Sequence, residues 1–168
     1  METQQAAEAP PWLSDEQLED WKALVALVVT LPAALDAQLK RDAGINTYEY
    51  HVLVALGAAP HGILPMTDLA LLAQGSPSRL SHAVSRLEHS GWVERGTCHE
   101  AGRRTSARLT PAGEAKLRET APGHVREARR LVVDTLTPDQ LATLGDSARA
   151  IVRGAAPDVA STLRDGEC

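Results

Sequence analysis

The stretch Gln74-Gly75-Ser76-Pro77 constrains the fold most, because it separates two runs of apolar residues at helical spacing. Leu69, Leu72 and Ala73 precede it, and Gly75 fits the left-handed position just past the end of a helix. Ser76 can cap the next helix and Pro77 can occupy its first position, so a second helix starts at once. We expect it to end at Ser90-Gly91. Two helices joined by so short a turn have the form of a helix-turn-helix.

The second of these helices is predicted to have two different faces. Leu80, Val84 and Leu87 recur at helical spacing, with Ala83 beside them, which predicts a buried stripe. The opposite face carries small hydroxyls and bases: Ser78, His82, Ser85 and His89, flanked by Arg79, Ser81 and Arg86. Small hydroxyls allow close approach to another surface, and arginine supplies charge and several hydrogen-bond donors.

Serine and histidine beside arginine also raise the alternatives of catalysis and metal binding. A nucleophile needs a base oriented by a third group, and no acid is placed near Ser78 and His82 on this helix. His82 and His89 would lie about 10 Å apart along the helix axis, and their spacing to Cys98 matches no strong zinc motif. We therefore expect no enzyme, no metal site and no cofactor, and a merely solvated face remains the plain alternative.

The segment after this helix is predicted to be a β-hairpin with a basic tip. Residues 92–95 and 106–109 alternate loosely and flank a polar stretch that contains Gly102, Arg103 and Arg104. Residues 76–110 hold six arginines and three glutamates, a local charge of +3 in a chain whose formal net charge is −5. The acidic total argues against indiscriminate binding to nucleic acid or anionic membranes, so the basic island indicates a local site for a polyanion.

The rest of the chain has helical patterns. Ser14 with Gln17 and Asn46 with Glu49 form capping-box pairs, and Thr110-Pro111 and Thr137-Pro138 are further helix starts. They predict helices from residue 14, from Asn46 to Gly57, and over about 111–136 and 138–153, while residues 62–65 form an edge strand. An apolar stripe follows the first start: Leu18, Trp21, Val25, Val28, Leu35 and Leu39.

Composition agrees with a mainly helical, intracellular domain. The 168 residues include no Phe and five aromatic side chains, so Leu, Val and Ala must build the core. Two cysteines make no disulfide framework, and the N-terminus is acidic, unlike a signal peptide. No apolar run approaches the roughly 20 residues that span a bilayer. We expect one cytoplasmic domain without membrane contacts.

From Leu53 through Leu117 the chain resembles the MarR family of winged helix-turn-helix transcriptional regulators. The resemblance is carried by MTDLALLAQGSPSRLSHAVSRLEHSGWVER (66–95) and GRRTSARLTPAGEAKL (102–117). It implies a mainly α, α+β fold with a DNA-binding lobe and a homodimerisation lobe of N- and C-terminal helices. The implied division of the single domain 1–168 is an arm 1–13, support helices 14–58, a winged helix-turn-helix 62–110, dimerisation helices 111–153 and a tail 154–168.

The resemblance also implies which residues contact DNA. The helix from Ser76 would be the recognition helix, with contacts from Ser76, Pro77, Ser78, Arg79, Ser81, His82, Ser85 and Arg86, the last on the DNA backbone. The hairpin would be the wing, with contacts from Arg103, Arg104 and Arg108. Ala101 departs from the family, which usually has an Asp there that helps to hold the wing arginine; Glu100 is a possible substitute.

Family members act as homodimers, which implies an inverted repeat in double-stranded DNA as the target. The apolar stripes at the two chain ends would then lie in the dimer interface. The alternative is that they pack within one chain. Many relatives are repressors that a small aromatic or phenolic effector releases from DNA, and candidate lining residues here are Trp12, Trp21 and His51, with Arg79. Cys98 lies beside His99 and is a candidate oxidant sensor, or else a plain wing cysteine. The alternative function is a dimeric ligand- or protein-binding module with weak or lost DNA binding, which Ala101 favours and the retained arginines oppose.

Overall fold

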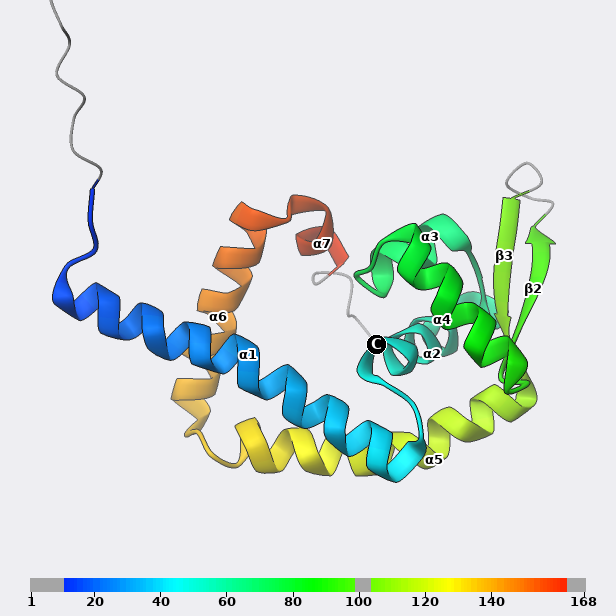
Figure 1. Ribbon diagram of the computed structural model, residues 1–168, viewed down its shortest axis with the longest axis horizontal. Coiled ribbons are helices and arrows are strands. Elements are labelled where there is room, and N and C mark those ends of the chain that lie inside the picture. Colours follow the sequence, from blue (N-terminus) through cyan, green and yellow to red (C-terminus); the bar gives the residue numbers. More distant parts are fainter. Residues whose placement is uncertain (1–10, 99–103, 163–168) are drawn as a thin grey trace, which may run out of the picture.

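The computed structural model describes residues 11–98 and 104–162, and helices make up most of it (Figure 1). The elements in chain order are α1 Asp15–Ala43, α2 Thr47–Ala58, β1 Ile63–Pro65, α3 Met66–Leu72, α4 Pro77–His89, β2 Val93–Cys98, β3 Arg104–Leu109, α5 Pro111–Ala128, α6 Pro138–Ala155 and α7 Pro157–Thr162. The strands form one antiparallel sheet in the order β1-β3-β2, with β1 on the edge as the sequence predicts. The mainly α, winged helix-turn-helix fold class is confirmed.

The predicted helix starts form because local side chains satisfy the first backbone N–H groups. Capping boxes are present at Ser14, Asn46 and Thr137, where side chain and backbone exchange hydrogen bonds across three residues. Ser76 accepts from the backbone N–H of Arg79, and Pro77 occupies the first position of α4. These positions follow from short-range sequence alone, which is why they could be predicted.

The turn between α3 and α4 differs from the prediction in one respect. The residue with left-handed backbone is Gln74, at φ 54°, and not Gly75. Gly75 is required for another reason: a Cβ there would lie 2.2 Å from the hydroxyl oxygen of Tyr48. The glycine therefore makes room for a tyrosine that belongs to α2.

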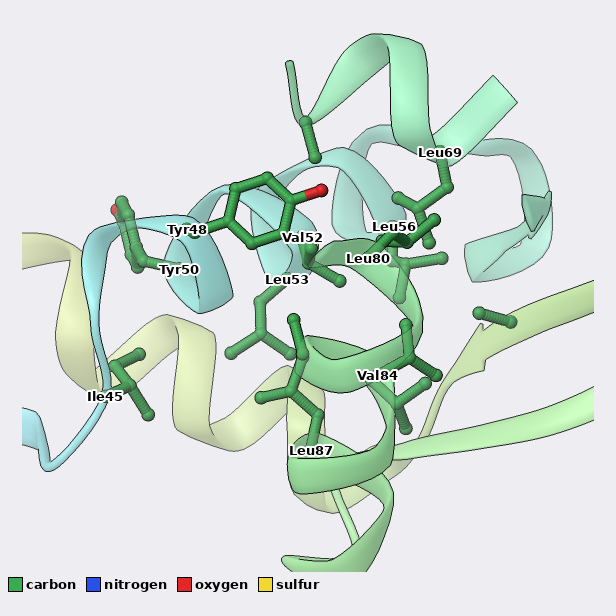
Figure 2. Close-up of a cluster of buried hydrophobic side chains, with 14 of the residues drawn as sticks. Ile45, Tyr48, Tyr50, Val52, Leu53, Leu56, Leu69, Leu80, Val84 and Leu87 are labelled. Atoms are coloured by element: carbon green, nitrogen blue, oxygen red, sulfur yellow. The ribbon is translucent and has the colours of Figure 1, made fainter. Parts of the chain in front are cut away.

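The core lies where α2, α3, α4 and the sheet meet (Figure 2). The predicted stripe of α4 is buried, with Leu80, Val84 and Leu87 at most 1% exposed. It packs against other fully buried leucines, among them Leu53 of α2 and Leu69 of α3. Because each buried leucine stabilises the fold by about 1.5–3 kcal/mol, this packing fixes which face of α4 is left for other partners.

The C-terminal half departs from the predicted boundaries. α5 runs through Pro122, and a π-helical turn, Arg129–Val133, follows it in place of a helix that continues to 136. α6 ends at Ala155, and the predicted tail 154–168 includes a further short helix, α7. α7 contacts α3, so the end of the described chain returns to the helix-turn-helix (Figure 1).

α1 packs against α5 and α2 only near its C-terminal end (Figure 1). Gln38 and Leu39 are its buried residues, whereas Trp21, Val28 and Val29 are 53–64% exposed. An 18-residue window of α1 has a mean hydropathy of 1.5 and is 11% buried, so by length and composition this helix could cross a membrane. This corrects the expectation that the chain holds no segment of that kind. In α6, all of which the structure describes, no residue is buried.

Candidate nucleic-acid interface

The polar face of α4 lies on the surface of the molecule, opposite the buried leucines. Ser76 caps the helix, and seven of the eight predicted contact residues of α4 are exposed: Ser76, Pro77, Ser78, Arg79, His82, Ser85 and Arg86. Ser81 is half-buried. The hydroxyls, the histidine and the arginines thus form one accessible strip that begins at a helix N-terminus, where backbone N–H groups and the helix dipole favour anions.

Arg79 leans from α4 onto α2. Its guanidinium carbon lies 4.2 Å from the centre of the Tyr48 ring, a cation–π contact. Tyr48 is only 5% exposed, and its hydroxyl has no hydrogen-bond partner among the described residues. Burial raises the pKa of Tyr48, and the charge of Arg79 partly opposes that shift. The ring gives the guanidinium of Arg79 a fixed support, which could not be predicted from the sequence.

Arg86 has a partner inside the protein. Its Nε donates to Oε1 of Glu49, a buried residue whose other carboxylate oxygen accepts from the backbone N–H of Asn46. The ion pair ties α4 to the N-terminal part of α2. Arg86 is still more than half exposed, so the predicted contact with the DNA backbone would share this side chain with Glu49.

Of the three arginines predicted to contact DNA from the hairpin, the structure describes two. Arg104 begins β3, and Arg108 is an exposed residue of β3 whose register partners are Ile63 of β1 and Glu94 of β2. The predicted wing-tip residue Arg103 and its neighbours Glu100 and Ala101 lie outside the described residues. Arg95 of β2, which the sequence analysis did not select for the interface, donates hydrogen bonds to α4.

A cavity of about 610 Å³ lies where α1, α2 and the helix-turn-helix meet. Its lining includes Lys40 of α1, Thr47, Tyr48 and His51 of α2, and Arg79 of α4. The hydroxyl of Thr47, like that of Tyr48, is buried and has no partner in the described part of the chain. The cavity offers a polar ligand the guanidinium of Arg79, together with Lys40 and Asp36, which pair with each other at 2.7 Å.

The three predicted effector residues do not come together in this cavity. His51 lines it, whereas Trp21 lines a separate hollow along α1 with Val25 and Val29. Trp12 is 85% exposed. Thr47 and Tyr48 were missed because they directly follow a capping residue, and no pattern in one sequence distinguishes a lining side chain there from an ordinary first-turn residue.

Two histidines lose part of their solvation to neighbouring groups: His51, which lines this cavity but remains exposed, and the half-buried His124. Desolvation lowers the pKa of His51, and the charge of Arg79 adds to the shift. Burial lowers the pKa of His124 on α5, with a further contribution from His51. The ring of His124 lies 4.6 Å from that of Tyr50, and its Nδ1 is 3.2 Å from Oε1 of Gln38. In both cases the surroundings therefore favour the neutral form of the ring over the charged one.

This burial predicts that the free energy of unfolding falls as pH drops from about 7.5 to 5. Below about pH 6.5 the unfolded chain takes up protons that the folded chain resists, because the folded pKa values of His51 and His124 are the lower ones. Urea denaturation at pH 7.5, 6.5 and 5.5 measures the slope. His124→Asn should flatten it, whereas His89→Asn on the exposed face of α4 should not; equal slopes for all three proteins would contradict the assignment.

A helix-turn-helix followed by an antiparallel hairpin, between two sets of supporting helices, defines this chain as a winged helix-turn-helix protein. It is similar to Sco3205 from Streptomyces coelicolor, a MarR family transcriptional regulator whose structure is a complex with DNA, with 43% identity over 89% of this chain and 94% of that one and a TM-score of 0.84. The chain belongs to the MarR family of transcriptional regulators.

One further structure agrees with this assignment at lower identity, and another shares the fold. AbsC from Streptomyces coelicolor, also a MarR family regulator, is 31% identical over 86% of this chain and 97% of its own, with a TM-score of 0.81. A regulator from Silicibacter pomeroyi shares the fold, at 24% identity, a TM-score of 0.70 and coverage of 89% and 99%. No protein-family model and no curated protein matches the chain.

Proposed function

We propose that the chain is a homodimeric, cytoplasmic repressor that binds an inverted repeat in double-stranded DNA and is released by a small aromatic or phenolic effector. The observation that carries the DNA-binding part is the exposed polar face of α4, which Arg95 of the hairpin contacts directly. Sco3205, at 43% identity, supports the same assignment because its structure contains DNA.

The geometry suits a helix that enters the major groove with its N-terminal end. Ser78 and His82 can donate to or accept from base edges, and Arg79 can bind guanine O6 and N7 with two hydrogen bonds. Arginines at the far end of the hairpin suit the narrow minor groove. α4 would then read sequence, and the wing would add affinity that depends on groove shape.

The exposed apolar residues of α1 and α6 support a second copy as the partner. Trp21, Val28 and Val29 of α1 and Leu144 and Ile151 of α6 are all more than a third exposed in the single chain. Contiguous exposed apolar surface marks an interface. Two-fold pairing of these faces would relate the two copies of α4 by the same axis, so their target would be an inverted repeat.

The effector part of the proposal rests on the cavity. Arg79 can pair with an ionised or hydrogen-bonding group, and the Lys40–Asp36 pair, at 2.7 Å, adds a donor and an acceptor for a phenolic hydroxyl. Because Arg79 belongs to the recognition helix and Lys40 to α1, a ligand there contacts both parts of the molecule. If this ligand binds the DNA-free conformation of the protein more tightly than the DNA-bound one, its binding releases DNA.

The test is fluorescence anisotropy of the purified protein with fragments of its own upstream DNA, titrated across salt with random DNA as competitor. Tight binding that resists competitor, weakens steeply with salt and saturates at two chains per site supports the proposal. Weak binding without sequence preference would favour the ligand- or protein-binding module instead. The same assay then screens phenolic compounds for release.

His82→Ala is expected to lower the ratio of operator to random-DNA affinity by about 10-fold, since one base contact contributes about 1–3 kcal/mol of discrimination. Affinity for random DNA and its salt dependence should change little, because both depend on contacts with phosphates and not on a contact with a base edge. The matched control is His89→Ala, on the same polar face but at the C-terminal end of α4. If His82→Ala bound operator like the wild type, the orientation of α4 in the groove would be wrong.

A further inference from the structure

Arg95, in the middle of β2, makes several contacts with the exposed side of α4. Its Nη2 donates to the carbonyl oxygen of Ser81 and to Oγ of Ser85, each at 2.8 Å. Its Nε lies 3.4 Å from one carboxylate oxygen of Glu88, and its backbone N–H donates to the other at 3.4 Å. A single residue of the hairpin thus contacts three positions of α4 spaced four and three residues apart.

These contacts fix the position of the hairpin as well as that of the Arg95 side chain. Arg95 is paired in register with Ala107 of β3, a residue with 0% exposure at the centre of the sheet. Two residues earlier, Val93 is buried in the core. The base of the hairpin is therefore attached to the core by Val93 and to the surface of α4 by Arg95, so the direction of the hairpin relative to α4 depends on both.

The hydrogen bond from Arg95 also limits how Ser85 can contact DNA. Ser85 already accepts one hydrogen bond from Arg95, so its hydroxyl proton and one remaining lone pair are left for DNA. Ser81 contributes its main-chain carbonyl to the same cluster. Two residues of the polar face thus support the hairpin as well as facing outward.

We propose that Arg95 is a positioning residue for DNA binding: with Ser81, Ser85 and Glu88 it locks the wing to the recognition helix at a set distance. The inference rests on the proposed function. A protein that contacts the major groove with α4 and the minor groove with the wing must hold both at the spacing of the duplex. A wing fixed before binding loses less conformational freedom when the complex forms, so the lock increases affinity without touching DNA.

A double-mutant cycle in DNA binding separates this role from a direct contact. The variants are Arg95→Ala, a wing variant with Arg103→Ala and Arg104→Ala, and the combination. Arg95→Ala should weaken operator binding about 10-fold in the wild-type background and less than about 2-fold in the wing variant, because a lock has no effect once the wing arginines are gone. Equal losses in both backgrounds, or no loss in the wild-type background, would overturn the proposal.

A charge-preserving variant distinguishes geometry from simple attraction to phosphate. Arg95→Lys keeps the positive charge but lacks the planar fork that serves Ser81, Ser85 and Glu88 together, so it should lose most of what Arg95→Ala loses. Wild-type affinity for Arg95→Lys would show that Arg95 acts through charge alone. Arg118→Ala, which removes an exposed arginine paired with Glu114 within α5, is the control for the change of net charge.

Hydrogen–deuterium exchange without DNA reports on the lock itself. Arg95→Ala should speed exchange of the amides of β2 and β3 while leaving α2 protected, whereas Arg118→Ala should change neither. Unchanged exchange in the hairpin would overturn the proposal. Failure of the wild-type protein to bind any DNA fragment would instead overturn the proposed function, and with it the use of the lock in DNA binding.

Discussion

Gly113→Ala is expected to destabilise the folded chain by about 3 kcal/mol, the upper part of the usual range for forcing an extra group into a packed site. A Cβ on Gly113 would lie 2.0 Å from the carbonyl oxygen of Trp92 and 2.9 Å from its carbonyl carbon. Both atoms belong to the backbone, so no side-chain rotation can relieve the overlap. Either α5 or the start of β2 must move.

The hydrogen bonds around this glycine explain why a shift would be costly. The backbone N–H of Thr110 donates to the carbonyl oxygen of Trp92 at 3.0 Å, and the Thr110 hydroxyl donates to that of Gly91 at 2.7 Å. The same hydroxyl accepts from the backbone N–H of Gly113 at 3.0 Å. The Leu-Thr-x-x-Gly pattern at 109–113 therefore joins the start of α5 to the chain between α4 and β2.

A second glycine of the same helix provides the matched control. At Gly123 the nearest atom to an added Cβ is a side-chain nitrogen of Gln38 at 3.5 Å, an ordinary contact distance. Gly123→Ala should therefore stabilise the chain by about 0.5–1 kcal/mol, the helix preference of alanine over glycine. Urea denaturation of both variants measures the difference. Effects of the same sign and size would show that α5 tolerates a methyl group at Gly113, contrary to the geometry.

The sequence predicted best those features that depend on neighbours within one or two helical turns. The caps at Ser14, Asn46, Ser76 and Thr137 and the buried leucines of α4 are of this kind. The pairing of Arg86 with Glu49 is not, because 37 residues separate them and helical spacing reports a face without naming its partner. Gly75 shows the same limit: a local rule assigned it a left-handed turn, whereas distant Tyr48 is what requires it.

The candidate site was predictable to a similar degree. The face of α4 that would contact DNA follows from periodicity, and its exposed residues are those that the sequence selected. The cavity beside it could not be predicted, because Lys40, Thr47 and Arg79 come from three elements that only tertiary packing brings together. For the same reason Arg95 was treated as part of a strand and not as a contact of the recognition helix.

Val28→Glu is expected to leave each chain folded but to separate the proposed dimer and to weaken operator binding by at least about 100-fold. Val28 is 58% exposed in the single chain, and glutamate favours helix at least as well as valine, so a monomer should tolerate the change. In the proposed dimer the same position is covered, and an unpaired buried carboxylate costs several kcal/mol. Loss of the second half-site then removes the effective-concentration gain of bivalent binding, which is typically 10²–10⁴.

Sedimentation equilibrium measures whether the variant is a monomer, and circular dichroism measures whether it is folded. Fluorescence anisotropy measures its affinity for operator DNA. Ala37→Glu is the control, because Ala37 is exposed on the same helix but nine residues on, about half a turn away from the stripe that contains Val28. The control should remain dimeric. If Val28→Glu also remained dimeric and bound operator like the wild type, the apolar stripe of α1 would need another partner. Because α1 is long and apolar enough to cross a bilayer, sedimentation of the wild-type protein with lipid vesicles would then decide whether that partner is a membrane.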